Sequence, residues 1–271
     1  MLAAALTALG AAPSGAAPLE RLVGSTESFA TDGVRYAAWA STEGPITVLD
    51  TRDDTTRSVP NPSSCAIDAS ARPAPRAIPI WCQGPASERT RVLDPRTGAI
   101  SPRPWPPRRA PAGPGPACRA LQRAAERVHR HPHLGSSDLA GVALSRGGRV
   151  VLRRCGEPDA VVGRHPWWAP PPLLSAGWLT WDTGWRSEYA PRLPRRAGAL
   201  HAVDVRTGER LRWRLAARTI EGCSGSATAP FGSSSHTRER VFWAATLAIR
   251  ELLGDCDAVA GRLRVFSARL P

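Results

Sequence analysis

One stretch of the chain, residues 198–215, has the sequence pattern of a β-hairpin with a well-marked turn. Its first half, Leu200 to Val205, is apolar and β-branched, as in a strand buried on both faces. Asp204 can accept hydrogen bonds from the backbone N–H groups after it, and Gly208 suits the positive φ of a bulged turn. The return, Arg210 to Leu215, alternates polar and apolar residues. The sequence therefore predicts two paired antiparallel strands.

Weaker copies of this pattern recur along the chain. A strand ending in aspartate and followed by a turn returns at Ile46–Asp50 and Thr90–Asp94, and a preceding strand usually carries a tryptophan. The strand tryptophans include Trp39, Trp81 and Trp243, and the first two are 42 residues apart. Such a period, with several strands per unit, is typical of a β-propeller. We predict an all-β propeller of about five four-stranded antiparallel blades, or six if the Cys118 region forms an irregular blade.

The hairpin resembles the repeat of pyrroloquinoline-quinone-type (PQQ-like) β-propeller proteins, which reads roughly G-x-[VL]-x-A-x-D-x-x-T-G-x-x-x-W-x. The matching residues are Gly198, Leu200, Ala202, Asp204, Thr207 and Gly208, and Trp213 lies one residue after the tryptophan position of the pattern. Partial matches occur at Leu49-Asp50 and at Asp94 with Thr97-Gly98. The same blade serves quinone-dependent dehydrogenases and catalytically silent scaffolds, so the resemblance implies an architecture and no particular chemistry.

Composition and charge narrow the class of protein. A chain of 271 residues with 42% hydrophobic content is large enough for one β domain with a core. Ten tryptophans stand against four phenylalanines and two tyrosines, and we expect them between blades rather than stacked on a ligand. All 36 basic residues are arginines and the net charge is +13, which would attract anionic polymers. Because the arginines are scattered, coding bias and solubility are the favoured explanation.

The first residues have the pattern of a secretion leader. An apolar core, Leu2 to Ala12, precedes Ser14 and Ala16, which suit the small-x-small rule for cleavage before Ala17. No positive segment precedes the core, so a start upstream or a fortuitous leader are the alternatives. We predict a signal peptide at residues 1–16, a single propeller domain at 17–271, and a secreted or extracytoplasmic location without nucleic-acid binding. No later stretch is long enough for a membrane span.

Six cysteines fit an oxidising compartment, and none lies in a C-x-x-C motif. Six cysteines allow 15 pairings. The repeat frame selects Cys65–Cys82, Cys118–Cys155 and Cys223–Cys256, each within one blade or its adjoining loop. Between the second and third blades, residues 117–130 show helical spacing of apolar residues bracketed by prolines, which predicts a short inserted helix. The third blade is predicted to continue with a strand from Leu139 to Ser145.

Three groups of residues have the composition of a catalytic or metal site. His129, His131 and His133, with Glu126, could bind zinc or copper, although Pro132 interrupts the ladder and a solvated loop is the favoured interpretation. Ser224 and Ser226 lie in G-C-S-G-S, which departs from the G-x-S-x-G nucleophile motif and suits a turn beside a disulfide. The recurring aspartates form a cation ring or, more simply, begin turns; these are Asp50, Asp94 and Asp204. We assign no catalytic, metal or cofactor-binding residue.

The favoured function is therefore a secreted, non-enzymatic propeller that binds a protein or an anionic cell-envelope polymer, as a monomer. The alternative is a propeller-funnel enzyme, either a quinone-dependent oxidoreductase or a glycan-active enzyme. Long insertions rich in Arg, Trp and Pro supply the candidate binding residues, since Trp and Arg dominate interface hot spots. These are Trp105, Arg108, Arg109, Trp167, Trp168, Trp185 and Arg186. We expect the tryptophans among them to be less buried than Trp39, Trp81 and Trp243.

Overall fold

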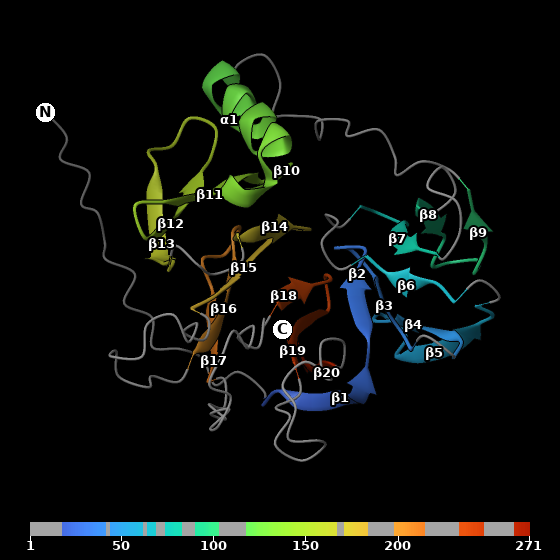
Figure 1. The fold of residues 1–271 in the computed structure, drawn as a ribbon. Coiled ribbons are helices and arrows are strands. Elements are labelled where there is room, and N and C mark those ends of the chain that lie inside the picture. The colour runs from blue at the N-terminus through green and yellow to red at the C-terminus, as the bar shows by residue number, and fades with distance from the viewer. Residues whose placement is uncertain are drawn as a thin grey trace, which may run out of the picture.

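The computed structural model describes residues 18–41, 44–61, 64–68, 74–82, 90–102, 118–166, 171–183, 198–214, 233–246 and 263–271. Within these residues the chain forms five four-stranded antiparallel sheets, one α-helix and a short 3-10 helix (Figure 1). The helices are α1 (Arg119–Arg130) and Pro132–Leu134. No helix among these residues is long and apolar enough to cross a membrane.

The strands are short and follow the chain from sheet to sheet. The first and second sheets contain β2 (Ser28–Thr31), β3 (Tyr36–Ala40), β4 (Ile46–Asp50), β5 (Thr55–Val59), β6 (Ala66–Ile67), β7 (Ile78–Trp81), β8 (Thr90–Leu93) and β9 (Ile100–Ser101). The third and fourth contain β10 (Gly135–Asp138), β11 (Gly141–Arg146), β12 (Arg149–Arg153), β13 (Ala160–Arg164), β14 (Leu173–Ser175), β15 (Trp178–Asp182), β16 (Ala199–Asp204) and β17 (Arg210–Arg214). The fifth contains β18 (Ser233–His236), β19 (Arg240–Thr246), β20 (Leu263–Arg269) and β1 (Glu20–Thr26).

The five sheets surround a common centre in a propeller-like arrangement (Figure 1). First strands in contact link the third, fourth, fifth, first and second sheets in a row, in the pairs β10–β14, β14–β18, β18–β2 and β2–β6. The N-terminal strand β1 pairs with β20, with Arg21 opposite Phe266, and so becomes the outermost strand of the C-terminal sheet. The five sheets match the predicted blade count.

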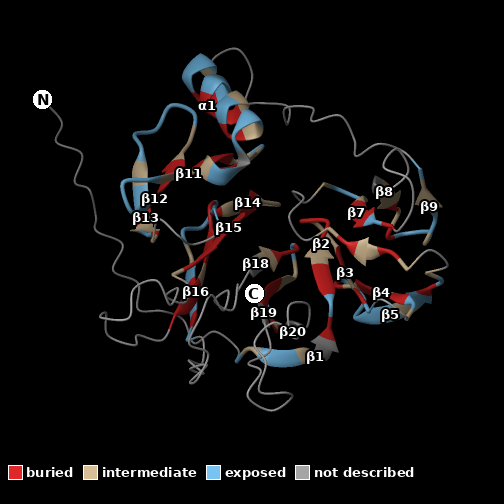
Figure 2. Ribbon diagram, viewed as in Figure 1, coloured by how far each residue is buried: buried red, intermediate tan, exposed pale blue. Residues whose placement is uncertain are grey.

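The hydrophobic core is divided among the junctions between sheets, and buried residues follow the strands there (Figure 2). Trp178 and Trp213 of the fourth sheet pack with Trp243 of the fifth, and all three are buried. Trp181 is buried between the third and fourth sheets. The expected role of strand tryptophans as wedges between blades is therefore found at these two junctions.

Trp81 differs from the buried strand tryptophans. It is 47% exposed, whereas Trp243 is 6% exposed and Trp39 is half-buried. Trp81 is the last residue of β7, and the neighbouring strand β6 is only two residues long, so little of the sheet covers its ring. Its repeat position predicted a buried ring, and this expectation is wrong because the strand ends there.

The inserted helix is α1, and it packs on the third sheet. Its buried residues, Leu121, Ala124, Ala125 and Val128, lie at helical spacing and contact Val142 of β11. The Cys118 region therefore leads into a helix and forms no sixth blade. This accounts for the periodicity within residues 117–130.

The predicted start of the next strand is wrong by two residues. Leu139 is 78% exposed in the β10–β11 turn, and the strand begins at Gly141. A Cβ at Gly141 would lie 2.4 Å from the carbonyl oxygen of Arg153, so only glycine lets the two strands approach here. The sequence also missed β10, whose residues Gly135–Asp138 have no apolar alternation.

Two of the three predicted cysteine pairs lie at disulfide-bonding distance. Cys65 and Cys82 have Cα atoms 3.9 Å apart, and those of Cys118 and Cys155 are 5.6 Å apart. The first pair is buried at the junction of the first and second sheets, and the second joins the start of α1 to the β12–β13 turn. The third predicted pair, Cys223–Cys256, lies outside the described residues.

The topology gives the molecule two faces. In a four-stranded antiparallel sheet, the connections between strands one and two and between three and four leave the same end. We call this end the turn face, and its connections are short, as in Thr51–Asp54. The connections between strands two and three, and from one sheet to the next, leave the opposite end. We call it the insertion face because the long connections at residues 103–117 and 184–197 start there.

Candidate functional site

All seven candidate binding residues lie in connections that leave the insertion face. Trp105, Arg108 and Arg109 follow β9, and Trp167 and Trp168 follow β13. Trp185 and Arg186 lie between β15 and β16. These residues are outside the described part of the chain, so their exposure stays a prediction. The same holds for the serine candidates Ser224 and Ser226 and for the leader.

Two of the long connections join equivalent strands of neighbouring sheets. The fourth sheet continues from β15 through residues 184–197 into β16, and the fifth continues from β19 through residues 247–262 into β20. The two sheets are in contact, since β18 contacts both β14 and β15. The two connections therefore start from equivalent strand ends of neighbouring sheets.

A neutral aromatic pair lies at the base of the first of these connections. Trp181 and His201 face each other across β15 and β16, with ring centroids 4.9 Å apart and an interplanar angle of 5°. Burial, together with the charges of Arg212 and Arg210, lowers the pKa of His201 to about 4. The imidazole is consequently neutral at physiological pH. Sequence reasoning missed this pair because its partners come from different strands.

The close packing of Trp181 depends on a glycine in the third sheet. A Cβ at Gly163 would lie 2.4 Å from Cζ2 of the indole ring. Outside the strand pairing, Thr183 donates its backbone N–H to the carbonyl oxygen of Ala199 at 2.8 Å. Ala199 in turn donates its N–H to Oγ1 of Thr183 at 3.0 Å. The strands that support the connection are therefore fixed by hydrogen bonds and by packing.

On the turn face, the three recurring aspartates begin turns, as the simpler interpretation predicted. Asp94 accepts the backbone N–H of Arg96 at 2.8 Å, and Asp204 accepts that of Arg206 at 2.8 Å. Asp50 accepts a longer bond, 3.2 Å, from the N–H of Arg52. At Asp94 and Asp204, these backbone donors lower the pKa of the carboxyl group against the opposing effect of burial.

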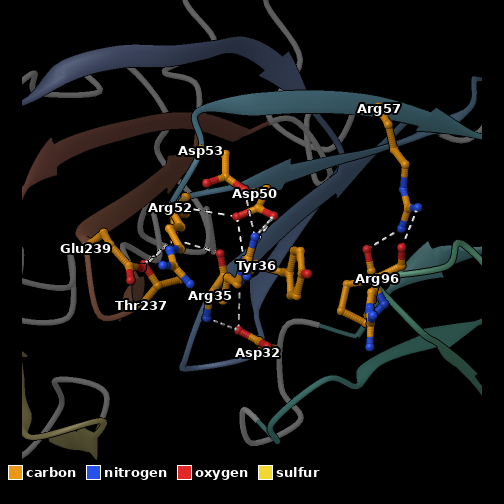
Figure 3. Close-up of polar contacts among 12 residues, drawn as sticks. Asp32, Arg35, Tyr36, Asp50, Arg52, Asp53, Arg57, Arg96, Thr237 and Glu239 are labelled. Carbon is orange, nitrogen blue, oxygen red and sulfur yellow. Dashed lines mark hydrogen bonds and ion pairs between the residues drawn. The ribbon is translucent and has the colours of Figure 1, made fainter.

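Asp50 also belongs to an arginine–carboxylate cluster that the sequence did not predict (Figure 3). Arg35 Nη2 lies 2.7 Å from Asp50 Oδ2 and 2.7 Å from Asp53 Oδ2. The hydrogen bond from Arg35 is the largest cause of a lowered pKa of Asp50. Sequence reasoning could not pair these groups, since Arg35 precedes Asp50 by a whole hairpin.

Further polar contacts join the first sheet to its two neighbours (Figure 3). Toward the fifth sheet, Thr51 Oγ1 donates to Oε2 of Glu239 at 2.9 Å, and Arg240 Nη2 lies 2.8 Å from Asp54 Oδ1. Toward the second sheet, Arg57 donates to the carbonyl oxygen of Arg96 at 2.6 Å. These groups hold sheets together, which accounts for their charge without a ligand.

Asp32 provides a similar link beside the centre. Its Oδ1 accepts the backbone N–H groups of Val34, Arg35 and Tyr36 at 2.8 to 2.9 Å. Its Oδ2 accepts the N–H of Arg76 from the second sheet at 3.1 Å. Asp32 is 1% exposed, so these hydrogen bonds satisfy the buried oxygens of its side chain. Asp32 therefore fixes the β2–β3 turn and attaches the second sheet to it.

The inner strands at the centre carry small polar side chains that bond to one another. His236 is fully buried; its Nδ1 lies 2.9 Å from Oγ1 of Thr180, and its Nε2 lies 2.9 Å from the carbonyl oxygen of Ser175. Thr31 Oγ1 lies 2.6 Å from Oγ of Ser235. Burial lowers the pKa of His236 to about 4. His236 thus links the fourth and fifth sheets as a neutral imidazole.

The histidine cluster of the sequence lies at the end of α1. His129 is in the last turn of the helix and His131 and His133 follow it, with the last two ring centroids 5.8 Å apart. Within the part of the chain that the structure describes, no three His, Cys, Asp or Glu side chains group as a metal site. The favoured interpretation was a solvated loop, and it is correct in that His131 and His133 are exposed. It is wrong about the backbone, because His129 lies in α1 and His133 in the 3-10 helix.

A cleft of about 630 Å³ lies beside the start of α1. It is lined by Cys118, Arg119, Arg153, Arg154, Cys155 and Glu157, among others. The two carboxylates of the β12–β13 turn are already used there: Asp159 pairs with Arg153 at 2.8 Å, and Glu157 pairs with Arg154. The cleft therefore presents a basic wall that the sequence did not predict.

Comparison with known proteins adds little to this description. A scan against family models and a search of curated proteins found no match. Among solved structures, the crystal structure of TolB from Acinetobacter baumannii aligns at 10% sequence identity with a TM-score of 0.26. The alignment covers 89% of this chain and 54% of that chain, so this chain spans about half of its length. We draw no functional conclusion from this likeness.

Proposed function

We propose that the chain is an extracytoplasmic, non-enzymatic binding domain of the closed β-propeller type, with repeats of the PQQ-like kind. It binds a protein or an anionic polymer of the cell envelope through its insertion face. The observation that carries the proposal is the common origin of the long connections: those after β15 and β19 leave equivalent ends of two sheets in contact. Such an origin lets residues on separate connections contribute to one binding surface.

The chemistry of those connections suits recognition. The sequence places Trp, Arg and Pro in them, including Trp167, Trp168 and Trp185. Large aromatic and guanidinium groups dominate binding hot spots, and proline lowers the entropy that a loop loses on binding. A net charge of +13 favours an anionic partner or an acidic protein surface.

The polar groups described above on the turn face and in the centre have structural partners, which supports binding over catalysis. On the turn face, Asp50, Asp94 and Asp204 hold turns, and Asp54 joins two sheets. In the centre, His236 is bonded at both ring nitrogens. A propeller-funnel enzyme would need such groups aimed at a substrate. The two disulfide-distance pairs and the predicted leader support an oxidising, extracytoplasmic location.

The test is a binding measurement with two probes, a purified acidic cell-wall polysaccharide that carries no phosphate and a detergent extract of envelope proteins. We expect saturable binding to one of them. A variant with alanine at Trp105, Trp167, Trp168 and Trp185 should lose at least about tenfold in affinity, because each hot-spot aromatic contributes about 2 kcal/mol or more. The matched control removes two exposed apolar side chains elsewhere, in L139A/V161A, and should bind as the unchanged protein does.

Two results would overturn the proposal. One is equal binding by the tryptophan variant and the control. The other is an absorbance spectrum of the purified protein that shows a bound chromophore, together with a stoichiometric metal. That second result would support the alternative function, an enzyme that uses the propeller funnel.

A further inference from the structure

An exposed row of arginines runs along α1. Arg119, Arg123 and Arg127 follow one another at intervals of four residues, and Arg130 continues the row; all four are exposed. Residues four apart lie on one side of a helix, with a rise of about 6 Å between them. We call these four residues the arginine stripe. Figure 2 shows the exposed outer side of α1, and Figure 1 places the helix at the edge of the molecule.

The helix that carries the stripe is fixed to the third sheet. The opposite side of α1 packs on β10 and β11 through Leu121, Ala124, Ala125 and Val128. The N-terminus of the helix is joined to the β12–β13 turn through Cys118 and Cys155. The positions of the four Cα atoms are therefore set by the third sheet, so a ligand need not order the helix in order to bind it.

The N-terminal part of the stripe does not stabilise the helix. Arg119, Arg123 and Arg127 lie four residues apart and repel one another, and Arg119 in the first turn opposes the helix dipole. Only in the last turn do Arg127 and Arg130 favour the dipole. The first turn contains no acidic residue, and within the described part of the chain none of the four arginines forms an ion pair with a carboxylate. Glu126, the acidic residue of α1, accepts a hydrogen bond from Gln122 at 3.3 Å. Charge that opposes local stability points to a role outside the fold.

Arginine is also more frequent in α1 than a coding bias across the whole chain would explain. Arginine makes up four of the 12 residues of α1, against 36 basic residues in the whole chain of 271. At its N-terminal end the stripe continues into the cleft, where Arg119 lies with Arg153 and Arg154. The carboxylates of that cleft are paired with Arg153 and Arg154, and Arg119 adds an unmatched positive charge.

The chemistry of the stripe selects among anionic partners. A helix that lies in a lipid surface needs an exposed apolar side, and the apolar side of α1 is buried against the sheet. A protein interface needs a large apolar centre, whereas the exposed side of α1 has no apolar residue larger than Ala120. Single-stranded nucleic acid is held by base stacking on aromatic rings, and α1 has no Trp, Tyr or Phe. A row of guanidinium groups instead fits successive phosphates, which each can bind in bidentate fashion.

We propose that the arginine stripe is a second binding surface, which holds a linear polyol-phosphate polymer with one phosphate in each repeat. It goes beyond the proposed function because it lies on the side of the third sheet and uses none of the insertion-face residues. The polymer lies along α1 from the cleft at Arg119 to Arg130, and its phosphates contact successive guanidinium groups.

The test measures the binding of fluorescent poly(glycerol phosphate) by polarisation at 50 and 200 mM salt. Four phosphate contacts on a flexible chain predict a slope of log K against log salt of about −3, which is about 50-fold weaker binding over this range. The variant R119Q/R123Q/R127Q/R130Q should bind at least about tenfold more weakly at 50 mM salt, with a slope near zero. Its unfolding midpoint should change little, since the changes are exposed and the relief of repulsion offsets the dipole interaction lost at Arg127 and Arg130.

The matched control, R146Q/R149Q/R212Q/R214Q, removes the same charge from exposed strand positions and should keep the wild-type slope. Equal loss of affinity in the stripe variant and this control would overturn the proposal, because net charge alone would then explain binding. Tighter binding of single-stranded dT20 than of poly(glycerol phosphate) would also overturn it. So would tighter, stripe-dependent binding of phosphatidylglycerol vesicles. The tryptophan variant of the insertion face should bind this polymer through α1 as the unchanged chain does, which separates the two proposals.

Discussion

Two junctions between sheets differ in the side chains that pack there. One lies between the fourth and fifth sheets, and the other lies between the first and second sheets. The former packs Trp178, Trp213 and Trp243 with aliphatic residues and is linked by the buried His236. The latter has no tryptophan among its buried core residues and instead packs isoleucines around the Cys65–Cys82 pair. Its sheet also contains two strands of only two residues each, β6 and β9.

The difference follows the completeness of the repeat. The hairpin at residues 198–215, in the fourth sheet, carries the full pattern, including the tryptophan of its last strand. The second sheet keeps the turn at Asp94 and lacks that tryptophan. In the second sheet, which lacks the tryptophan, the Cys65–Cys82 link constrains the strands instead. The tryptophans of this chain therefore fall into two groups. Those at strand positions of these junctions are required for packing, and the others are not.

Removal of a junction tryptophan should have the largest effect. Trp213 is 4% exposed, so W213A should lower the free energy of unfolding by about 3–5 kcal/mol through lost burial and the cavity left behind. The matched control is W81A, because Trp81 is 47% exposed in the other half of the molecule. It should cost about 1 kcal/mol or less. Urea unfolding measures both, and similar losses would mean that the two halves do not differ in this way.

Removal of the Cys65–Cys82 disulfide should destabilise the second sheet, because no tryptophan of the described residues packs in its junction with the first sheet. In C65A/C82A we expect a loss of about 3 kcal/mol, because the link closes a loop of 17 residues in the unfolded chain. Native-state hydrogen exchange should show faster opening of β7 and β8, with β15 and β16 unchanged. Faster exchange in both pairs of strands would contradict the separation of the two junctions.

Acid should weaken the tryptophan-packed junction through His236. Its pKa is about 4 in the folded chain and about 6.5 when unfolded, so the unfolded state binds the proton first as pH falls. Its contribution is complete above about pH 6.5 and is lost as pH falls toward 4, by about 3 kcal/mol at most. H236N should flatten the profile of unfolding free energy between these values, although it is less stable at pH 7. The exposed-residue control H133N should keep the wild-type slope.

Substitution of the turn aspartates should have the smallest effect on the free energy of unfolding, and this effect should be the same in the second and fourth sheets. Asp94 and Asp204 each accept a backbone N–H at 2.8 Å from the residue two positions on. We expect D94A and D204A each to lose about 1–2 kcal/mol in urea unfolding, the cost of a lost charge-assisted hydrogen bond. A much larger loss for one than for the other would show that the turn itself, and not only the junction, differs between the sheets.

The sequence predicted the features that repeat locally. The alternation of apolar residues and the turns that begin with Asp predicted the strands and the number of sheets. The helical spacing of apolar residues between two prolines predicted α1. It could not predict contacts that depend on how the sheets meet. The roles of His236 and Asp32 depend on partners in other sheets, and nothing near them in sequence marks those partners. The exposure of Trp81 and the late start of β11 depend on where neighbouring strands end or approach, which periodicity does not encode.

The central claim is that strand tryptophans hold the fold and insertion tryptophans serve binding, and oxidative footprinting of the unbound protein tests it directly. Mass spectrometry of the labelled chain gives a rate for each tryptophan. Trp178, Trp213 and Trp243 provide the buried reference, and the half-exposed Trp81 provides the exposed one. The account predicts that Trp105, Trp167, Trp168 and Trp185 are oxidised at rates near that of Trp81. Rates as low as those of the buried set would contradict it, because these rings would then pack over the ends of the sheets.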